Sequence, residues 1–206
     1  MDARATVLDL GAGTGKLTRV LAERYARVVA VEPLDELRTI LAERVPGADV
    51  RAGWAESIPL ADAEVDAVFA GQAFHWFAND TAVGEIARVL RPGGVLALLW
   101  NQTNGESPLP EAYRRRLSAL HDEGRPEEVD LNILRHFPFG EEHEDSDGHE
   151  QFSTRDDVLA FAASVSWIAK RDAREQVLEE LASLLPAGDY AFPLRCEMTW
   201  TIRSSD

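Results

Sequence analysis

Cysteine and lysine are nearly absent from this sequence. One cysteine, Cys196, occurs in 206 residues, which excludes an internal disulfide and is typical of the reducing cytoplasm, where we expect the protein. The lysines are Lys16 and Lys170, and 36 acidic residues against 21 basic ones give a formal net charge of -15. Because binding to nucleic-acid phosphates needs clustered Lys and Arg, no nucleic-acid partner is expected.

Long apolar runs are also absent. No run approaches the ~20 apolar residues that span a bilayer, and the N-terminus lacks the basic segment and long apolar run of a signal peptide. We therefore expect no membrane partner. The composition is 45% hydrophobic and 28% charged, which is ordinary for a globular protein, and the length suits one well-cored domain.

One stretch near the N-terminus carries the strongest pattern. An apolar run of strand length, residues 6–10, is followed by glycines at alternate positions and then by apolar residues at helical spacing, which predicts a strand, a glycine turn and a helix. Gly11, Gly13 and Gly15 would let a ligand lie against the backbone, since no side chain stands in the way. A second buried-strand run ends at Glu32, which is placed to accept the two hydroxyls of a ribose.

Three nucleotide-binding sequence patterns are compared with this glycine turn. A Walker phosphate loop is rejected, because Leu10 lies where its first glycine should be and Leu17 replaces the hydroxyl that would hold magnesium. A dinucleotide loop is disfavoured, because Lys16 occupies its third glycine position. The pattern present is G-x-G-x-G after V-L-D-L. A glycine turn that binds no ligand is the structural alternative, and the spacing to Glu32 argues against it.

Segments typical of strands and helices alternate along the chain. The strand runs of the first half are continuously apolar, which indicates a parallel sheet covered on both faces, with its ligand at the carboxyl ends of the strands. Further strands are predicted at residues 28–31, 48–52, 65–70, 95–100, 152–153 and 191–203. Helices are predicted at residues 34–44, 81–90 with Thr81 as its cap, 110–121, 154–163 and 172–185, whereas residues 124–148 are expected to be irregular and acidic.

Several segments resemble, in order and spacing, the motifs of class I S-adenosylmethionine (SAM) methyltransferases. The glycine turn resembles the first of these motifs. The others are Val31-Glu32-Pro33, residues 53–60 near the adenine, residues 65–77 with Gln72-Ala73-Phe74-His75-Trp76-Phe77, and residues 85–96 with Arg91-Pro92-Gly93-Gly94. The resemblance covers about the first half of the chain. It is strongest to the type 11 branch, which includes relatives of trans-aconitate methyltransferase.

This resemblance implies an α/β fold. The sheet would be doubly wound, mostly parallel and Rossmann-like, with about seven strands, helices on both faces and an antiparallel last strand. A single domain would cover residues 1–206, with a cofactor-binding half at 1–103 and a substrate-side, C-terminal half at 104–206. Relatives usually carry a helical segment before the first strand that covers the cofactor, and we expect this chain to lack that lid.

The resemblance also implies the site residues. SAM, the implied cofactor, would be bound by Asp9, Gly11, Gly13, Gly15, Glu32, Trp54, Ala55, Glu56 and Gln72. The acceptor site would be lined by Phe74, Trp76, Trp100 and Asn101. His75 is the candidate general base, because its ordinary pKa lies near neutrality. Packing as a wall of the pocket is the alternative for His75, and a carboxylate acceptor would need no base. Trp54 stands where many relatives have an acidic residue that bonds the adenine.

Four histidines lie in the second half of the chain, some of them close to acidic residues: His121, His136, His143 and His149. Residues 144–149 are acidic but lack the full ligand set of an EF-hand. A solvated acidic loop is therefore favoured, and no metal is expected.

The sequence thus predicts an enzyme, a SAM-dependent methyltransferase that acts on a small-molecule acceptor by O-, N- or C-methylation. A non-catalytic or truncated methyltransferase-like binding module is the first alternative, and a dinucleotide-dependent oxidoreductase is the second. The expected partners are the small-molecule acceptor and, in a homodimer, a second copy of the chain.

Overall fold

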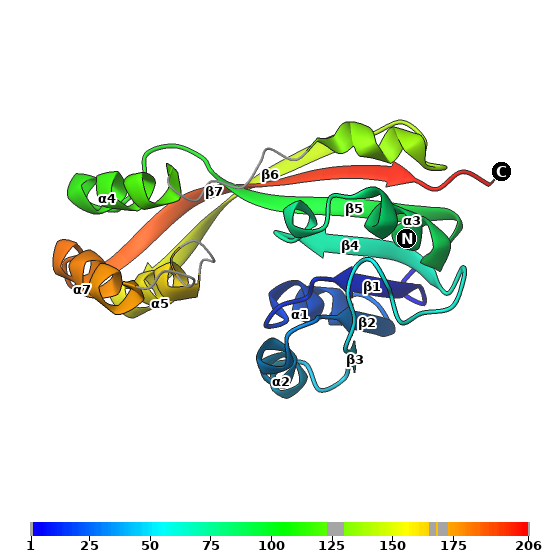
Figure 1. Ribbon diagram of the computed structural model, residues 1–206, viewed down its shortest axis with the longest axis horizontal. Helices are drawn as coiled ribbons and strands as arrows, with labels where there is room; N and C mark the ends of the chain where they lie inside the picture. Colours follow the sequence, from blue (N-terminus) through cyan, green and yellow to red (C-terminus); the bar gives the residue numbers. More distant parts are fainter. Residues whose placement is uncertain (1, 123–129, 165–167, 169–172, 206) are drawn as a thin grey trace. The chain divides into compact units, whose positions relative to one another are not determined.

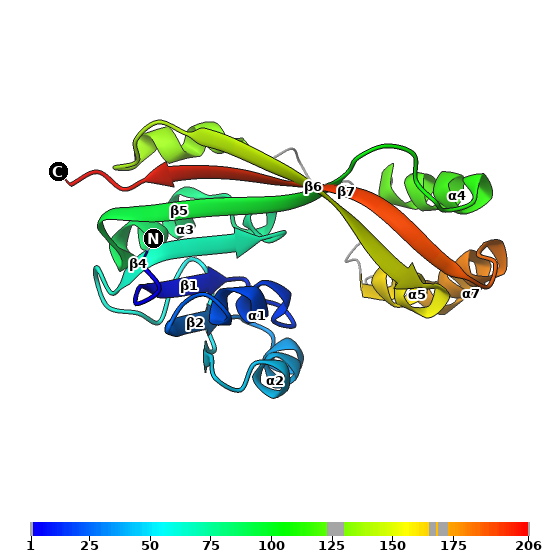
Figure 2. The ribbon, with the colours of Figure 1, turned by 180° about the vertical axis from the view of Figure 1, so that it is seen from behind.

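The computed structural model describes residues 2–122, 130–164, 168 and 173–205, and their strands form a sheet in the order β3-β2-β1-β4-β5-β7-β6 (Figure 1, Figure 2). The strands are β1 (Thr6–Leu10), β2 (Arg27–Val31), β3 (Asp49–Arg51), β4 (Val65–Gly71), β5 (Leu90–Thr103), β6 (His143–Thr154) and β7 (Asp189–Ile202). The first five pair in parallel. β7 is antiparallel to β5, since the N–H of Gly93 bonds to the Arg203 carbonyl and the N–H of Arg203 bonds to the Gly94 carbonyl.

The strand order reverses between β1 and β4. From β1 the chain adds β2 and β3 on one side, and it then returns to add β4 and β5 on the other. Such a reversal leaves a crevice at the carboxyl ends of the two central strands, because the connections leave in opposite directions. The prediction of a doubly wound, mostly parallel sheet with an antiparallel last strand is confirmed.

Two compact units divide the chain. Unit 1 contains Met1–Trp100, Glu128–Ser146 and Glu197–Asp206, and unit 2 contains Asn101–Glu127 and Asp147–Cys196. The expected single domain over residues 1–206, with halves at 1–103 and 104–206, stays a prediction.

The central strands of unit 1, β1, β2 and β4, are buried on both faces. Three helices connect them: α1 (Lys16–Ala22), α2 (Asp35–Arg44) and α3 (Asp80–Val89). The core residues on the α3 face include Leu8, Val29, Val68, Val83 and Ile86. Those on the α1 face include Val7, Val28, Ala67 and Leu21. Neighbouring residues of a strand fall into different clusters because successive side chains point to opposite faces, which explains why these strands are continuously apolar in sequence.

The N-cap of α3 differs from the prediction. The cap is Asn79 rather than Thr81, and its Oδ1 accepts the N–H of Ala82 at 3.0 Å. An asparagine just before the first turn satisfies one of the N–H groups that the helix leaves free. Thr81 already lies inside the helix, so its hydroxyl is not at the capping position.

β5 begins earlier than predicted. The sequence places a turn at residues 91–94 and a strand from residue 95, but β5 already starts at Leu90. Gly93 and Gly94 bond to the backbone of Arg203, so this stretch pairs with the end of the chain as a strand would. The pairing of β4 with β5 accommodates the stretch by a register shift between Val65 and Ala67.

The expectation of an irregular acidic segment at residues 124–148 and a separate strand at 152–153 is wrong over residues 143–154. His143–Thr154 is one strand of 12 residues, and it lies at the edge of the sheet. Its side chains from His143 to Phe152 are exposed. A strand exposed in this way needs no apolar alternation, and its charges discourage pairing with another edge. Residues 124–129 of the same prediction lie outside the described residues.

Unit 2 packs helices around an apolar cluster. The helices are α4 (Glu111–Asp122), α5 (Arg155–Ser164) and α7 (Arg174–Leu184). The buried residues of the cluster include Tyr113, Val158, Ala162, Val177 and Leu181. Arg155 donates to the carbonyls of Ala182 and Leu185, both at 2.8 Å, which satisfies groups that the end of α7 leaves free. None of the helices in the described part of the chain has the length and apolar character that a membrane crossing demands.

Candidate functional site

The glycine turn joins β1 to α1 at the point where the strand order reverses. The φ angles of its glycines are 71°, 56° and 82°, at Gly11, Gly13 and Gly15. These values lie in the left-handed region, which glycine adopts at little cost. The N–H groups of Gly11 and Ala12 donate to the Val31 carbonyl at 2.9 and 3.1 Å. A Cβ on Gly11 would lie 2.8 Å from the Cβ of Ala73. The turn is therefore fastened to the end of β2 and lies against the segment that follows β4.

Gly13 differs from the other two glycines in facing open space. A Cβ on Gly13 would have no heavy atom within 4 Å, whereas a Cβ on Gly15 would lie 3.1 Å from Leu41 Cγ. The backbone of Gly13 is thus accessible from outside the turn. This middle glycine is the position at which a ligand can approach the main chain.

Glu32 directly follows β2 and meets the glycine turn. It is only 5% exposed, and its Oε2 accepts the N–H of Gly13 at 2.9 Å while its Oε1 accepts the N–H of Leu34 at 3.0 Å. A carboxylate has about four acceptor positions, so two backbone donors leave room for two hydroxyl donors. The structure therefore brings Glu32 and Gly13 together, as the sequence spacing predicts, in an arrangement that suits a ribose.

Asp9 lies in β1, under the turn. It is 1% exposed, and its Oδ2 accepts the hydroxyl hydrogen of the fully buried Thr18 of α1 at 2.6 Å. Burial raises the pKa of Asp9 to about 7, and the negative charge of Glu32 adds to the rise, while the hydrogen bonds from Thr18 oppose it. The contact holds α1 against β1. A direct role of Asp9 toward the cofactor stays a prediction.

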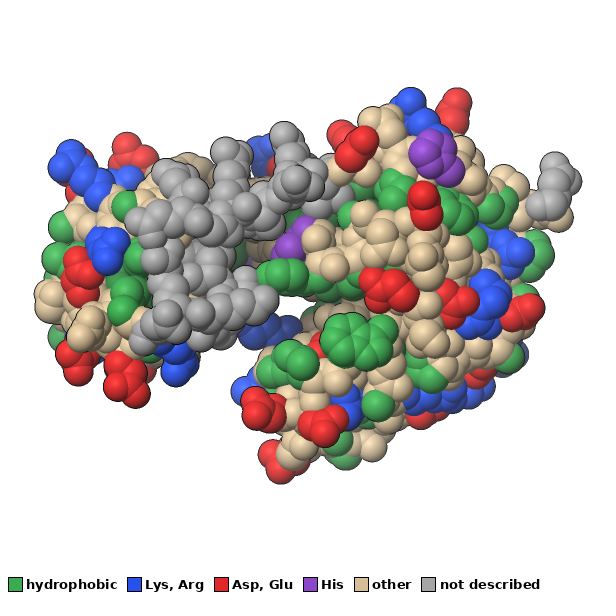
Figure 3. Space-filling model, in the orientation of Figure 1, with side chains coloured by type: hydrophobic (Ala, Val, Ile, Leu, Met, Phe, Trp, Pro, Cys, Tyr) green, Lys and Arg blue, Asp and Glu red, His purple; other side chains and the backbone are tan. Residues whose placement is uncertain are grey.

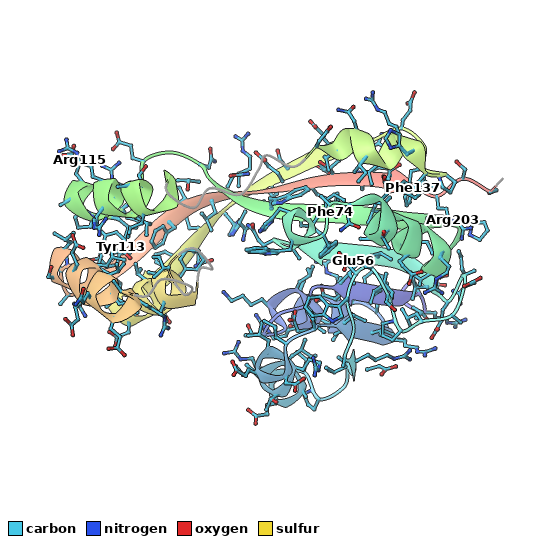
Figure 4. The ribbon with its side chains drawn as sticks, in the orientation of Figure 1. Glu56, Phe74, Tyr113, Arg115, Phe137 and Arg203 are labelled. Atoms are coloured by element: carbon cyan, nitrogen blue, oxygen red, sulfur yellow. The ribbon has the colours of Figure 1, made fainter. Side chains whose placement is uncertain are left out.

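The segment between β3 and β4 carries three of the predicted cofactor residues. Ala55 is buried, and Trp54 is 62% exposed. Glu56 (Figure 4) is exposed, and its Oε1 accepts a hydrogen bond from Asn79 Nδ2 at 2.9 Å. The N–H of Ser57 donates to the Trp54 carbonyl at 3.1 Å and closes a narrow turn. An indole this exposed presents an apolar face on which a flat ring can stack.

Gln72 follows β4 with a strained backbone. Its φ of 55° lies in the left-handed region, which costs a non-glycine residue ~1–2 kcal/mol. Its N–H donates to the Leu99 carbonyl at 2.9 Å, so the neighbouring strand holds this conformation in place. Strain of this kind persists where surrounding contacts over-determine it, and it is concentrated at binding and catalytic sites.

The 3-10 helix η1 (Phe74–Trp76) contains the candidate base. Phe74 is fully buried and packs edge-on against Phe77, with ring centres 5.6 Å apart, so it supports η1 from within the core (Figure 4). Trp76 is 58% exposed, and its ring centre lies 4.9 Å from that of His75. Burial lowers the pKa of His75, so the imidazole is neutral near pH 7 and able to accept a proton.

Trp100 and Asn101 are neighbours in β5 but belong to different units. Trp100 is half-buried and packs against the core of unit 1. Asn101 is exposed and belongs to unit 2. Their role in lining an acceptor site stays a prediction, as do the roles of Phe74 and Trp76.

Exposed apolar side chains accompany these residues in unit 1. Leu34, Trp54 and Trp76 are 54%, 62% and 58% exposed, and each follows the end of a strand, β2, β3 or β4. Figure 3 shows hydrophobic side chains grouped with acidic ones on the visible face of unit 1. Grouped apolar exposure of this kind is typical of a binding surface.

Two of the four histidines in the second half of the chain contact residues outside a metal site. His143 stacks on Trp200 with ring centres 4.3 Å apart, and His136 Nδ1 lies 3.8 Å from Asp80 Oδ1. The side chain of His121 lies outside the described residues. Among the side chains that the structure describes, no three His, Cys, Asp or Glu residues lie together as a metal site requires.

Sequence reasoning missed four residues that shape this site: Thr18, Asn79, Glu85 and Arg88. Thr18 interrupts the apolar face of α1 with a hydroxyl, which is a weak signal for a buried polar contact. The other three act on a loop more than twenty positions earlier in the chain, and sequence periodicity carries no information about such contacts.

Curated sequences include close relatives. Residues 8–98 match the family described as Methyltransferase domain. An uncharacterized methyltransferase-like protein of Schizosaccharomyces pombe is 35% identical over 195 residues, which are 90% of this chain and 76% of that protein. A trans-aconitate 2-methyltransferase of an Azoarcus species is 41% identical over 106 residues, 48% of this chain and 40% of that protein. The chain spans about half the length of several curated relatives it matches, with 45% and 41% in two of them.

Solved structures share the fold. The YcgJ protein of Bacillus subtilis has a TM-score of 0.62 at 19% identity, with 99% of this chain and 94% of that chain covered. A geranyl diphosphate methyltransferase in complex with SAM has a TM-score of 0.57 at 13% identity, with 98% and 79% covered. At these identities the likeness shows the fold alone.

Proposed function

This chain belongs to the class I methyltransferase family, and on that premise we propose that it binds SAM and transfers the methyl group to a small-molecule acceptor. The activity of the whole protein is part of the proposal, because the chain spans about half the length of several of its relatives. The proposal covers the cofactor, the reaction and the acceptor class.

One observation carries the cofactor assignment. The carboxylate of Glu32 accepts the N–H of Gly13 at the topological switch point, and Gly13 faces open space. A nucleoside lying there would meet a carboxylate for its ribose hydroxyls and a main chain without side chains in its way. The exposed indole of Trp54 supports stacking on an adenine. The residues present therefore fit the adenosine portion of SAM.

When bound, SAM supplies a methyl group that its sulfonium already activates for an in-line displacement. The remaining work of the chain is to bind, to orient and to exclude water. Gln72 lies at the end of β4 with its backbone fixed by Leu99, which suits a residue that positions the cofactor beside the acceptor. The exposed ring of Trp76 suits contact with an acceptor and the exclusion of water.

His75 suits the removal of a proton from the acceptor. Because burial lowers the pKa of His75, the ring is mostly neutral near pH 7. A neutral imidazole is the form that accepts a proton. An oxygen or nitrogen acceptor that must lose a proton would use this group. The relative named trans-aconitate 2-methyltransferase supports a small-molecule acceptor, and a carboxylate acceptor would need no base.

Calorimetric titration tests this function. S-adenosylhomocysteine (SAH), the demethylated product, is titrated into the wild type, Glu32→Ala and the control Glu36→Ala, which changes an exposed glutamate of α2. We expect the wild type and Glu36→Ala to bind SAH equally, Glu32→Ala to lose binding, and NAD to bind none of them. Binding of NAD but not SAH to the wild type would contradict the proposal and favour an oxidoreductase.

A further inference from the structure

Two charged residues of α3, Glu85 and Arg88, form a bidentate pair beside the loop between β3 and β4. Arg88 Nε and Nη2 donate to the two carboxylate oxygens of Glu85 at 2.6 and 2.8 Å. The Arg88 side chain is 30% exposed and the Glu85 side chain 21%. A two-bond guanidinium–carboxylate pair fixes the orientation of both groups as well as their separation.

The pair holds the peptide groups on both sides of Ile58. Glu85 Oε2 accepts the N–H of Ile58 at 2.8 Å, and Arg88 Nη2 donates to the Ile58 carbonyl at 3.0 Å. Arg88 Nη1 also donates to the Leu60 carbonyl at 2.8 Å. Ile58 and Leu60 are buried, so these backbone groups need protein partners in place of water. Side chains of α3 supply them.

Further contacts fix the same loop. Asn79, the cap of α3, donates its amide N–H to Glu56 at 2.9 Å. Arg51 Nη1 donates to the Pro59 carbonyl at 2.7 Å. The loop between β3 and β4 contains neither helix nor strand. Side-chain hydrogen bonds therefore fix its backbone in place of the backbone hydrogen bonds of a helix or sheet.

The geometry points to a positioning role: we propose that Glu85 and Arg88, acting through Ile58, set the position of Trp54, Ala55 and Glu56 against the adenosine portion of the cofactor. The proposal rests on the proposed function, since adenosine contacts this loop only if the chain binds SAM.

The connection from Ile58 to Trp54 is short and stiff. Ser57 bonds back to the Trp54 carbonyl at 3.1 Å, and both Ala55 and Ile58 are buried in the core of unit 1. Consecutive Cα atoms are a fixed distance apart, so a shift of Ile58 moves the turn that presents Trp54. A loose loop would instead absorb the shift.

The test uses substitutions that keep charge or shape but lose the bidentate bond. Arg88→Lys keeps the positive charge without the planar fork. Glu85→Gln keeps an oxygen for the Ile58 N–H and serves as the second variant if Arg88→Lys does not fold. The matched control is Arg91→Lys, which replaces the guanidinium in a different arginine–carboxylate pair of unit 1, the pair with Asp66.

Two readouts are measured on folded protein. Hydrogen exchange without ligand reports on residues 52–62, and calorimetry gives the affinities for SAH and for 5′-methylthioadenosine, which keeps the adenosine portion but lacks the amino acid. We expect Arg88→Lys to quicken exchange at residues 52–62 and to leave exchange at the glycine turn unchanged. We expect it to weaken both ligands by the same factor, about tenfold, whereas Arg91→Lys changes neither readout.

The outcomes separate the two claims. Unchanged exchange in Arg88→Lys overturns the inference. Quicker exchange with unchanged SAH affinity also overturns it, because the pair would then support the loop without serving the cofactor. An equal loss in Arg91→Lys would indicate general loosening and overturn it as well. Failure of the wild type to bind SAH contradicts the proposed function itself. Hydrogen exchange is measured without ligand, so it still tests whether Arg88 holds residues 52–62 in that case.

Discussion

Thr18 donates its hydroxyl hydrogen to Asp9 across 2.6 Å, and the two side chains are 0% and 1% exposed. The bond joins the first helix to the first strand directly beneath the glycine turn. It places the buried carboxyl of Asp9 next to the proposed cofactor site, where the negative charge of Glu32 raises the pKa of Asp9 further. The stability of the turn should therefore depend on pH.

Stability should fall as pH rises through the titration of Asp9. The pKa of Asp9 is raised from 3.8 to about 7, so between these values the folded state binds more protons than the unfolded state. The free energy of unfolding then decreases with pH, by at most ~1.4 kcal/mol per pH unit, and levels off above pH ~7. Urea denaturation of the wild type and Asp9→Asn from pH 5 to pH 8 measures this. If the free energy of unfolding changes with pH equally in the wild type and in Asp9→Asn, the prediction is wrong.

Removing the hydroxyl of Thr18 should destabilise the chain more than removing its methyl group. Thr18→Val keeps the shape but leaves the buried Asp9 without its side-chain donor, at a cost of ~1–3 kcal/mol. Thr18→Ser keeps the donor and loses one buried methyl, for about 1 kcal/mol. Thermal or urea denaturation at pH 7 compares the variants. Equal losses would show that packing, not the hydrogen bond, is what Thr18 contributes.

A side chain at Gly13 should block the ligand. Gly13→Ala places its methyl in the open space beside Glu32 and costs ~1–2 kcal/mol of stability, because φ is in the left-handed region. We expect SAH affinity to fall well beyond this stability effect. The control is Gly47→Ala, an exposed position that also has open space around its Cβ but lies outside the turn. Full SAH affinity in folded Gly13→Ala would argue against a ligand at this glycine.

The two exposed indoles should separate cofactor binding from turnover. Trp54→Ala should weaken SAH by removing a stacking surface, and Trp76→Ala should leave SAH binding intact while lowering methyl transfer. Both side chains are more than half exposed, so we expect changes in stability within ~0.5 kcal/mol. Calorimetry with SAH and detection of SAH formation with a panel of small-molecule acceptors measure the two effects. The reverse pattern would exchange the roles of the two residues.

Much of the sheet could be predicted because its strands are buried on both faces. Val7 and Leu8, or Val28 and Val29, are apolar neighbours that face opposite helices, so each strand is a short continuous apolar run. β6 could not be predicted in this way. Its residues are exposed, and backbone pairing along a sheet edge places no apolar requirement on the side chains.

The site could be predicted only where chain spacing sets its geometry. Gly13 and Glu32 each follow the end of a central strand, so parallel pairing alone brings them together. The bond of Arg88 to Ile58 joins positions 30 apart through a side chain and a loop, and no periodicity records it. Phe74 is fully buried, and the sequence of a 3-10 helix of three residues does not reveal which side chain faces the core.

The central claim is that a nucleoside cofactor lies between the glycine turn and Glu32. A crystal structure of the chain grown with SAH tests it most directly. The account predicts the ribose hydroxyls on the Glu32 carboxylate, the ligand against the Gly13 backbone and the adenine beside Trp54. Well-ordered SAH bound elsewhere, or an empty turn at a saturating concentration of SAH, would contradict the account.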